Sequence, residues 1–264
     1  MRFVKMVGTG NDFIVLDLRR QRANGHLLAL ARALCRRAQA VGADGLLTIE
    51  PSRRADVKMR VINPDGSEAE MCGNGARCVA HYVAQGRRGR SLTLDTKAGL
   101  VHAEIVSTER VRVTLPDPSP VLAVRLTALG KALTVYAVNT GVPHAVVVVP
   151  DLRRLDVQAL GAAIRRHRVF APAGTNVDFM QPVNHHTVRV RTYERGVEHE
   201  TLACGTGAVA AALAAASLGR ASSPTTVVPT SGERLVIRFE PSGRRWRRVS
   251  LEGAVRKVFE GVLA

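Results

Sequence analysis

Two nearly identical stretches decide the fold of this chain, Cys72-Gly73-Asn74-Gly75-Ala76 and Cys204-Gly205-Thr206-Gly207-Ala208. Each precedes a largely apolar segment with helical spacing, so each cysteine is predicted to lie at a helix N-terminus. Unpaired backbone N–H groups and the helix dipole favour an anion there, which makes a thiol easier to ionise. Because the two cysteines are separated by half the length of the chain, we expect two similar halves that each contribute one thiol.

Further residues ahead of each cysteine extend the repeat. Asn11 and His144 precede their cysteines by nearly the same interval, and Asp44 and Asn176 precede them by an identical one. Between the halves, the proline-rich run 115–120 has the composition of a linker. The sequence therefore predicts two α/β (α+β) domains of one topology, each with short mixed strands wrapped around the helix after its cysteine. We expect the active site in the cleft between them.

The expected elements follow the hydrophobic pattern. Helices are predicted over 26–37, after Cys72 to Gly86, after an N-cap at Asp156, and over 208–218. Strands are predicted over 2–7, 12–18, 45–50, 57–63, three within 91–115, then 133–138, 145–149, 177–180, 187–193 and several within 225–258, among them 234–239 and 249–252.

Composition limits the class of protein. A hydrophobic fraction of 46% with 23% charged residues is typical of a globular enzyme or binding protein. The first residues carry charges and no continuous apolar run, and the longest mostly apolar stretch, 208–218, is shorter than the roughly 20 residues that span a bilayer. We expect a cytoplasmic protein without a membrane partner. Its four cysteines would be reduced, and their spacing does not suggest a metal site.

The formal net charge of +16 raises the alternative of a nucleic-acid-binding module. The basic residues form only short pairs, such as Arg36-Arg37, spread over both halves, and aromatic residues are 4% of the chain. We interpret the charge as a solvated, arginine-rich surface and expect no nucleic-acid partner. The alternative predicts salt-sensitive binding to DNA that survives replacement of both cysteines.

Two thiols on opposite sides of a carbon atom form a general base and a general acid. This arrangement suits stereoinversion, in which one side removes a proton and the other returns one. Backbone N–H groups at both helix N-termini would hold a small anionic substrate. Cys35 and Cys78 are instead interpreted as core residues, since each falls within a predicted helix.

Nearby polar residues extend the candidate site. Glu194 could take an ammonium group and Arg195 a carboxylate, as an amino acid substrate requires. His144 falls at the turn of the repeated hairpin, and three asparagines, Asn11, Asn63 and Asn176, fall in turns that bear glycine or proline. We expect all of these residues to contribute to one site.

Three runs carry a family resemblance over nearly the whole chain. They are 5–13 (KMVGTGNDF), 63–78 (NPDGSEAEMCGNGARC), and 194–196 (ERG) with 203–207 (ACGTG). They closely resemble diaminopimelate epimerase, which implies a cofactor-independent isomerase interconverting LL- and meso-2,6-diaminopimelate on the path to lysine and peptidoglycan. The resemblance also implies a homodimer and two domains related by a pseudo-twofold axis, residues 1–117 with 252–264 and residues 118–251, the C-terminal end completing the first.

The resemblance implies a role for each matching residue. Cys72 and Cys204 would be the paired acid and base, with His144 tuning the first thiol and Glu194 the second. Substrate contacts would come from Asn11, Asn63, Asn176, Glu194 and Arg195, and from the loops Gly73-Asn74 and Gly205-Thr206.

Two positions depart from common family patterns, Gly45 where some members have glutamine and Val142 where many have asparagine. Either change removes a side-chain hydrogen bond from the expected pocket.

Two alternative enzyme families share the expected fold. A proline or hydroxyproline racemase would use the same cysteine pair on another amino acid, and a phenazine-type isomerase lacks the pair.

Overall fold

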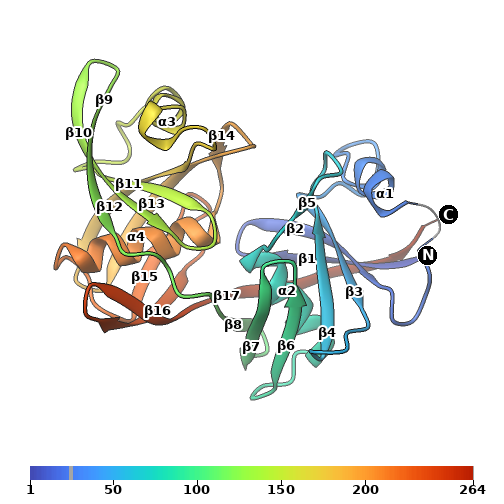
Figure 1. Ribbon diagram of the computed structural model, residues 1–264. Helices are drawn as coiled ribbons and strands as arrows, with labels where there is room; N and C mark the ends of the chain where they lie inside the picture. The colour runs from blue at the N-terminus through green and yellow to red at the C-terminus, as the bar shows by residue number, and fades with distance from the viewer. Residues whose placement is uncertain (24–25, 264) are drawn as a thin grey trace. The chain divides into compact units, whose positions relative to one another are not determined.

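The computed structural model describes residues 1–23 and 26–263 (Figure 1). It divides into two compact units, Met1–Thr114 with Glu252–Ala264, and Leu115–Leu251. Each unit has a helix enclosed by strands, α2 (Gly73–Ala84) in the first and α4 (Gly205–Ser217) in the second.

In the first unit, paired strands form a closed ring around α2. The ladder runs from β17 through β1, β2, β3, β4, β6, β7 and β8 and back to β17. The strands are β1 (Arg2–Gly8), β2 (Asn11–Asp17), β3 (Gly45–Glu50), β4 (Val57–Ile62), β5 (Glu68–Ala69), β6 (Ser91–Thr96), β7 (Gly99–Ser107), β8 (Arg110–Thr114) and β17 (Arg245–Val262), and the outer helix is α1 (Leu27–Leu34).

The second unit repeats this order of pairing. Its ladder runs β9–β10–β11–β12–β13–β15–β16, parallel at β11–β12 and β13–β15 as the first is at β2–β3 and β4–β6. This match confirms the predicted α+β repeat. The elements are β9 (Leu122–Ala128), β10 (Lys131–Asn139), β11 (Pro143–Val148), α3 (Val157–Arg165), the 3₁₀ turn η1 (Arg168–Phe170), β12 (Asn176–Asn184), β13 (Thr187–Glu194), β14 (His199–Thr201), β15 (Thr225–Val228) and β16 (Leu235–Ser242).

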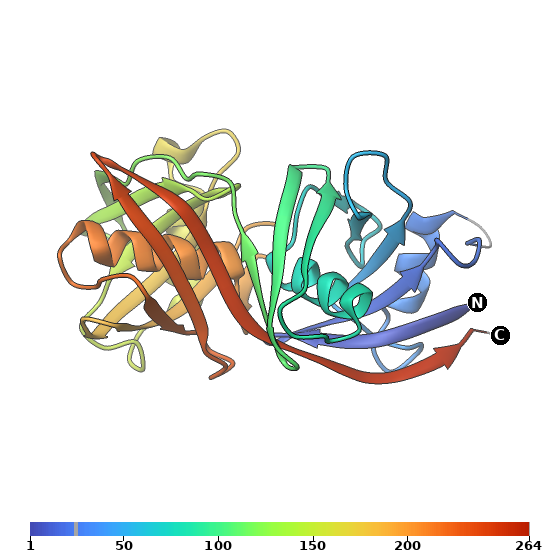
Figure 2. The ribbon, with the colours of Figure 1, turned by 90° about the horizontal axis from the view of Figure 1, so that it is seen from below.

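Strand β17 belongs to both units, and Figure 2 shows it in red as one continuous strand. Its residues up to Leu251 lie in the second unit, where Trp246 packs edge to face on Phe239 of β16. Its remaining residues pair with β1 in the first unit, from Gly8 with Val255 to Arg2 with Val262. The structure therefore has one long strand where the sequence suggested a short one over 249–252.

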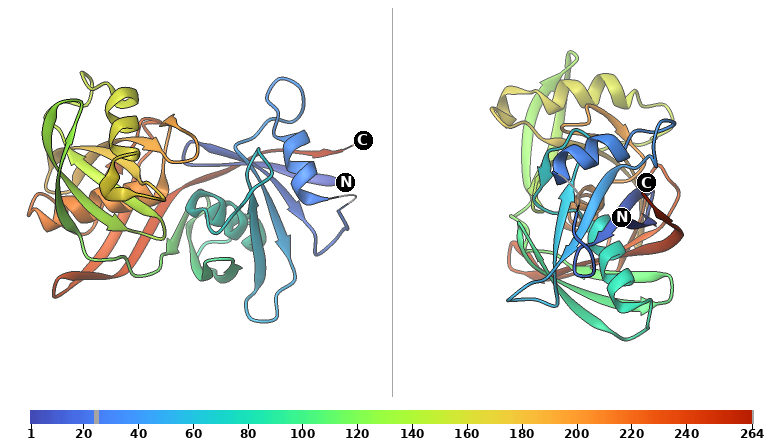
Figure 3. Two further views of the ribbon diagram at one scale, coloured as in Figure 1. Left: turned by 45° about the horizontal axis from the view of Figure 1, so that its top comes forward. Right: turned by 90° about the vertical axis from the view of Figure 1, so that its right-hand side faces the viewer.

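Each unit has an apolar core on both sides of its ladder. On the inner side, α4 is buried from Gly207 to Ala215, and its alanines allow the surrounding strands to approach closely. On the outer side, α1 and α3 (blue and yellow in Figure 3) cover two separate clusters. The α1 cluster contains Ile14, Leu46 and Ile62, and the α3 cluster contains Ala145, Val177 and Tyr193.

These clusters correct the predicted repeat equivalences by one or two residues. Phe13 pairs with Gly45 in the first unit, and His144 pairs with Asn176 in the second. Because Ile14 and Ala145 occupy the same outer face, the equivalent pairs are Phe13 with His144 and Gly45 with Asn176, which share one offset along the chain. The predicted equivalences of Asn11 with His144 and of Asp44 with Asn176 are therefore wrong.

Two further expectations differ from the structure. The first helix ends at Leu34, short of the predicted residue 37, because the chain turns at residues 36–41, with Ala38 at φ 64°. Strand β9 has no predicted counterpart. Most of its residues are exposed, so it lacks the apolar alternation on which the prediction relied.

Candidate active site

Both repeated cysteines are N-cap residues. Cys72 precedes α2 with φ −138° and ψ 114°, and Cys204 precedes α4 with φ −119° and ψ 114°. The glycines of each motif lie inside the first helical turn, where the sequence analysis had placed them ahead of the helix. This geometry confirms that each cysteine lies at a helix N-terminus.

The surroundings of the two thiols differ. Cys72 is half-buried, and its Sγ accepts a hydrogen bond from the N–H of Gly75 at 3.4 Å. Cys204 is buried, and its Sγ lies 3.4 Å from Oγ1 of Thr206. Burial raises the pKa of the Cys204 thiol well above its usual value, and the carboxyls of Glu194 and Asp178 raise it further. These effects favour the neutral thiol at Cys204.

A buried arginine holds the loop around Cys72. Arg77 is fully buried in α2 and donates to the carbonyl of Gly73 at 3.2 Å, to Oδ1 of Asn74 at 2.7 Å and to Oγ1 of Thr9 at 2.8 Å. These bonds join the first turn of α2 to the β1–β2 hairpin. They keep the backbone beside Cys72 in one conformation.

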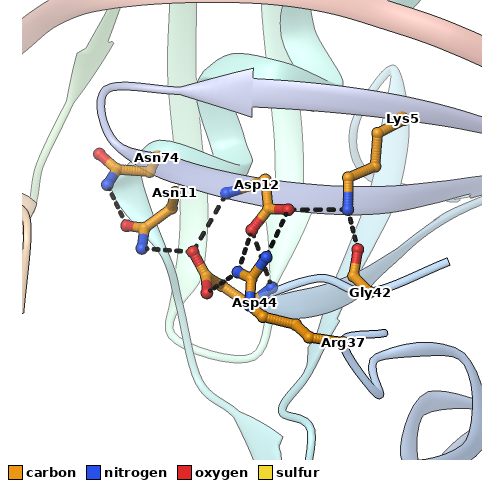
Figure 4. Close-up of polar contacts among 7 residues, drawn as sticks. All are labelled: Lys5, Asn11, Asp12, Arg37, Gly42, Asp44 and Asn74. Atoms are coloured by element: carbon orange, nitrogen blue, oxygen red, sulfur yellow. Dashed lines mark hydrogen bonds and ion pairs between the residues drawn. The ribbon is translucent and has the colours of Figure 1, made fainter. Parts of the chain in front are cut away.

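The polar network continues from Asn74 across the hairpin (Figure 4). Asn74 donates to Oδ1 of Asn11 at 2.6 Å, and Asn11 donates to Asp44 at 3.0 Å. Asp44 and Asp12 share Arg37, with N–O distances of 2.7 and 2.6 Å, and Asp12 also pairs with Lys5 at 2.8 Å. Burial alone would raise the pKa of Asp12, but the hydrogen bonds and charges of Arg37 and Lys5 lower it to about 2.

This network holds both ends of the Asn11 amide, so Asn11 and Asn74 lie together. Asn63 is not part of it. Its amide instead donates to Oγ of Ser67 at 2.9 Å within the turn after β4.

On the second unit, five polar residues lie on one face of three neighbouring strands. Asn176 and Asp178 alternate with outer-core residues in β12, as Thr192 and Glu194 do in β13, and His144 lies opposite Asn176 on β11. Asp178 lies against Gly207 of α4, so this face is turned toward the helix that Cys204 begins. Glu194 is half-buried there, and its partial burial raises its pKa.

Asn176 and Arg195 are tied together by their backbone and amide groups. The backbone N–H of Arg195 donates to Oδ1 of Asn176 at 2.8 Å, and the Asn176 amide donates to the carbonyl of Pro143 at 3.2 Å. The half-buried Arg195 guanidinium donates to the carbonyl of Ala173 at 3.3 Å. The structure thus brings together His144, Asn176, Glu194 and Arg195 near the Cys204 end of α4. The prediction that His144 acts on Cys72 stays a prediction.

The corrected register also relates the two unusual positions to the asparagines. Asn11 is equivalent to Val142, and Asn176 is equivalent to Gly45, with the same offset along the chain in both pairs. The first unit therefore has Asn11 but a glycine at the position of Asn176. The second unit has Asn176 but a valine at the position of Asn11.

The comparison with protein families matches a diaminopimelate epimerase model to residues 3–120 and 136–258. The chain belongs to the diaminopimelate epimerase family. A diaminopimelate epimerase of Aquifex aeolicus is 43% identical over 276 residues, covering 100% of this chain and 98% of the relative. One from a Hydrogenobaculum species is 40% identical over 278 residues, covering 100% and 99%. Membership makes this chain an isomerase of the epimerase type.

Solved structures of low sequence identity share the fold of the diaminopimelate epimerase family. A hydroxyproline epimerase from Agrobacterium vitis has a TM-score of 0.72 at 18% identity, covering 99% of this chain and 90% of that one. A phenazine biosynthesis protein of Bacillus anthracis has a TM-score of 0.74 at 14% identity, covering 100% and 99%. At these identities the likeness concerns the fold alone.

Three residues of the candidate site had no role predicted from the sequence. Arg77 stands within the quoted motif but received no role, and Asp178 and Thr192 lie inside strand patterns. Asp178 is a carboxylate within the otherwise apolar run 177–180, and this contrast could have indicated a buried functional residue. A buried charge is costly unless it is paired, so such a residue needs a partner that only the fold can supply.

A cavity in the second unit is not lined by any of the predicted site residues. It has a volume of about 650 Å³ and is lined by side chains of β12 to β15, including Arg189, Arg191 and Glu200. Arg191 and Glu200 are already paired at 2.6 Å.

Within residues 1–23 and 26–263, no helix is long and apolar enough to cross a membrane, and no group of three or more His, Cys, Asp or Glu side chains is arranged to hold a metal.

The four thiols are expected to differ in reactivity. Cys72 is the half-buried one, whereas burial raises the pKa of Cys35 to about 11 and of Cys78 to about 12 and also protects Cys204. Since the thiolate is the nucleophile, iodoacetamide at pH 8 should modify Cys72 first. Peptide mass spectrometry over time checks the order, and protein in guanidinium chloride should lose it. Earlier modification of Cys35 in the native protein would contradict the burial.

Proposed function

We propose that this enzyme interconverts LL- and meso-2,6-diaminopimelate by proton transfer between the substrate α-carbon and the thiols of Cys72 and Cys204. The observation that carries the proposal is the matched N-cap geometry of the two cysteines in a chain of the diaminopimelate epimerase family. Two residues with the same backbone conformation at the start of equivalent helices suit one reaction that needs two opposed acid/base groups.

The first step binds the carboxylate at the reacting carbon. Backbone N–H groups in the first turns of α2 and α4, at Gly73-Asn74 and Gly205-Thr206, would donate hydrogen bonds to it, since helix N-termini favour anions. The same groups stabilise the negative charge that grows on the carboxylate oxygens as the α-proton leaves.

The second step moves two protons. One cysteine, as thiolate, takes the α-proton and becomes a thiol, while the other gives its proton to the opposite face of the carbon and becomes a thiolate. The neutral state favoured at Cys204 supports Cys72 as the base and Cys204 as the acid for the first turnover. The reverse reaction exchanges these roles and restores the starting protonation.

The remaining site residues would hold the rest of the substrate. Glu194 would accept a hydrogen bond from an ammonium group, and Arg195 would bind a carboxylate. Asn11, Asn63 and Asn176 would supply further polar contacts. A substrate with two amino acid ends uses all of these groups, whereas proline has one such end.

The proposal includes the setting of the reaction. Both thiols must stay reduced, so the enzyme would act in the cytoplasm. The reaction would need no pyridoxal phosphate, because the two thiols perform the proton transfer. We place the reaction in the supply of lysine and of the peptidoglycan cross-link, and we include a homodimer, as the family resemblance implies.

Incubation of the reduced protein with LL-diaminopimelate in heavy water tests the function. We expect the meso isomer to appear with deuterium at its α-carbon, without added pyridoxal phosphate or metal. Chiral chromatography follows inversion, and mass spectrometry follows exchange. L-Proline is the matched control and should remain unchanged. Turnover of proline with none of diaminopimelate would replace this proposal by a proline racemase.

A further inference from the structure

A buried ionisable pair lies on the inner face of the second unit. Nδ1 of His144 lies 2.7 Å from Oδ2 of Asp178, and neither side chain is exposed to solvent. Oδ1 of Asp178 accepts a hydrogen bond from Oγ1 of Thr192 at 2.8 Å. Charged groups rarely lie this deep without a specific task or a compensating partner.

The scaffold itself does not require this pair. In the corrected register, Phe13 is equivalent to His144 and Leu47 to Asp178, and both are buried apolar residues. The packing supports the second equivalence, because a Cβ added at Gly75 would meet Leu47, and one added at Gly207 would meet Asp178. The same fold therefore holds an apolar pair in one unit and an ionisable pair in the other.

The hydrogen bonds favour one tautomer of the imidazole. A carboxylate oxygen accepts hydrogen bonds, so the 2.7 Å contact between Nδ1 and Oδ2 suits a proton on Nδ1 of His144. The other ring nitrogen, Nε2, is buried and has no hydrogen-bond partner among residues 1–23 and 26–263. A buried polar atom without a partner is unfavourable, so Nε2 is suited to meet a bound ligand.

The same carboxylate is locked against the helix that carries the second thiol. A Cβ at Gly207 would lie 2.2 Å from Oδ1 of Asp178, so the carboxylate rests on the first turn of α4. Asp178 thus joins the imidazole to the backbone that follows Cys204. Thr192 holds the remaining oxygen and leaves Asp178 little freedom to rotate.

We infer that Asp178 is a positioning residue, which holds the His144 imidazole in the Nδ1-protonated form and presents Nε2 to the substrate of the epimerase. The inference rests on the proposed function for the identity of that substrate. The inference goes beyond the proposed function because it assigns a role to Asp178 and explains why the two units differ at this place.

Asp178→Asn tests the inference with two readouts. The variant keeps the size of the side chain and removes its charge, so the preference for a proton on Nδ1 should weaken. In ¹⁵N-histidine-labelled protein, the ring nitrogens of His144 should show a protonated Nδ1 in the wild type and a mixture of tautomers in the variant. His144→Gln assigns the signals. We expect kcat for diaminopimelate to fall about 10- to 100-fold, the range known for the loss of the outer partner of a metal-binding histidine.

The matched control is Asp156→Asn, the same change at the N-cap of α3, where the side chain accepts from the N–H of Ala159 at 2.9 Å. It should leave both the His144 signals and kcat unchanged. Unchanged ring signals in Asp178→Asn would overturn the inference, whatever the rate. If the ring signals respond as expected but the wild type does not turn over diaminopimelate, the proposed function fails and the positioning role stands.

Discussion

Replacement of Cys204 by alanine is expected to lower kcat for the inversion of LL-diaminopimelate by about 10³-fold or more, and Cys72→Ala should have an effect of the same order. General acid–base groups contribute about 10²- to 10⁴-fold each, and alanine can neither take nor give a proton at either position. Chiral chromatography of the product, combined with deuterium exchange at the α-carbon, measures the loss.

The matched control for this prediction is Cys35→Ala. Cys35 is also buried, but it packs in the outer cluster with α1 and has no place in the proposed chemistry. Its variant should retain activity within about twofold, with a modest loss of stability from the cavity. If Cys204→Ala kept a tenth of the wild-type rate, the two-thiol mechanism would have to be abandoned.

The second large effect is expected from Gly207→Ala. Alanine normally stabilises a helix relative to glycine by about 1 kcal/mol, but here its Cβ would lie 2.2 Å from Oδ1 of Asp178, which two hydrogen bonds hold in place. Overpacking and disturbance of a buried charged pair should reduce the free energy of unfolding by about 3 kcal/mol. We also expect a loss of activity of at least about 100-fold. Urea denaturation and the epimerase assay measure the two effects.

Two glycines of the first motif provide comparisons. At Gly73 nothing lies within 4 Å of an added Cβ, so Gly73→Ala should leave stability unchanged or raise it by up to about 1 kcal/mol. At Gly75 the added Cβ would meet a methyl of Leu47 at 2.9 Å, which can move, so Gly75→Ala should be intermediate. Equal stability of Gly207→Ala and Gly73→Ala would show that the Asp178 carboxylate is not held where the structure has it.

Local patterns were sufficient to predict most elements. Strand β3 has the predicted bounds, Gly45–Glu50, because it is a short apolar run limited by turn residues. The N-cap of α3 was predicted at Asp156, whose side chain does accept from the backbone of Ala159. The paired cysteine motifs identified both central helices and the family.

Long-range features could not be predicted in the same way. The repeat equivalences were wrong by one or two residues because spacing alone does not show which face of a strand is buried. Arg77 and Asp178 went unassigned because their partners, such as Thr9 and His144, lie far away in the sequence. The environment that favours the neutral thiol at Cys204 also depends on β12 and β13, which lie outside its own motif.

Strand β17 has a consequence for the order in which the protein can fold during synthesis. Domains generally fold as they emerge, the N-terminal one first. Here the first unit needs Glu252–Val262 to close its ring, and the backbone of Met1 bonds that of Leu263. The first unit therefore cannot close until residues 252–262 have been translated, while residues 115–251 are available earlier. We therefore expect the second unit to complete its fold before the first.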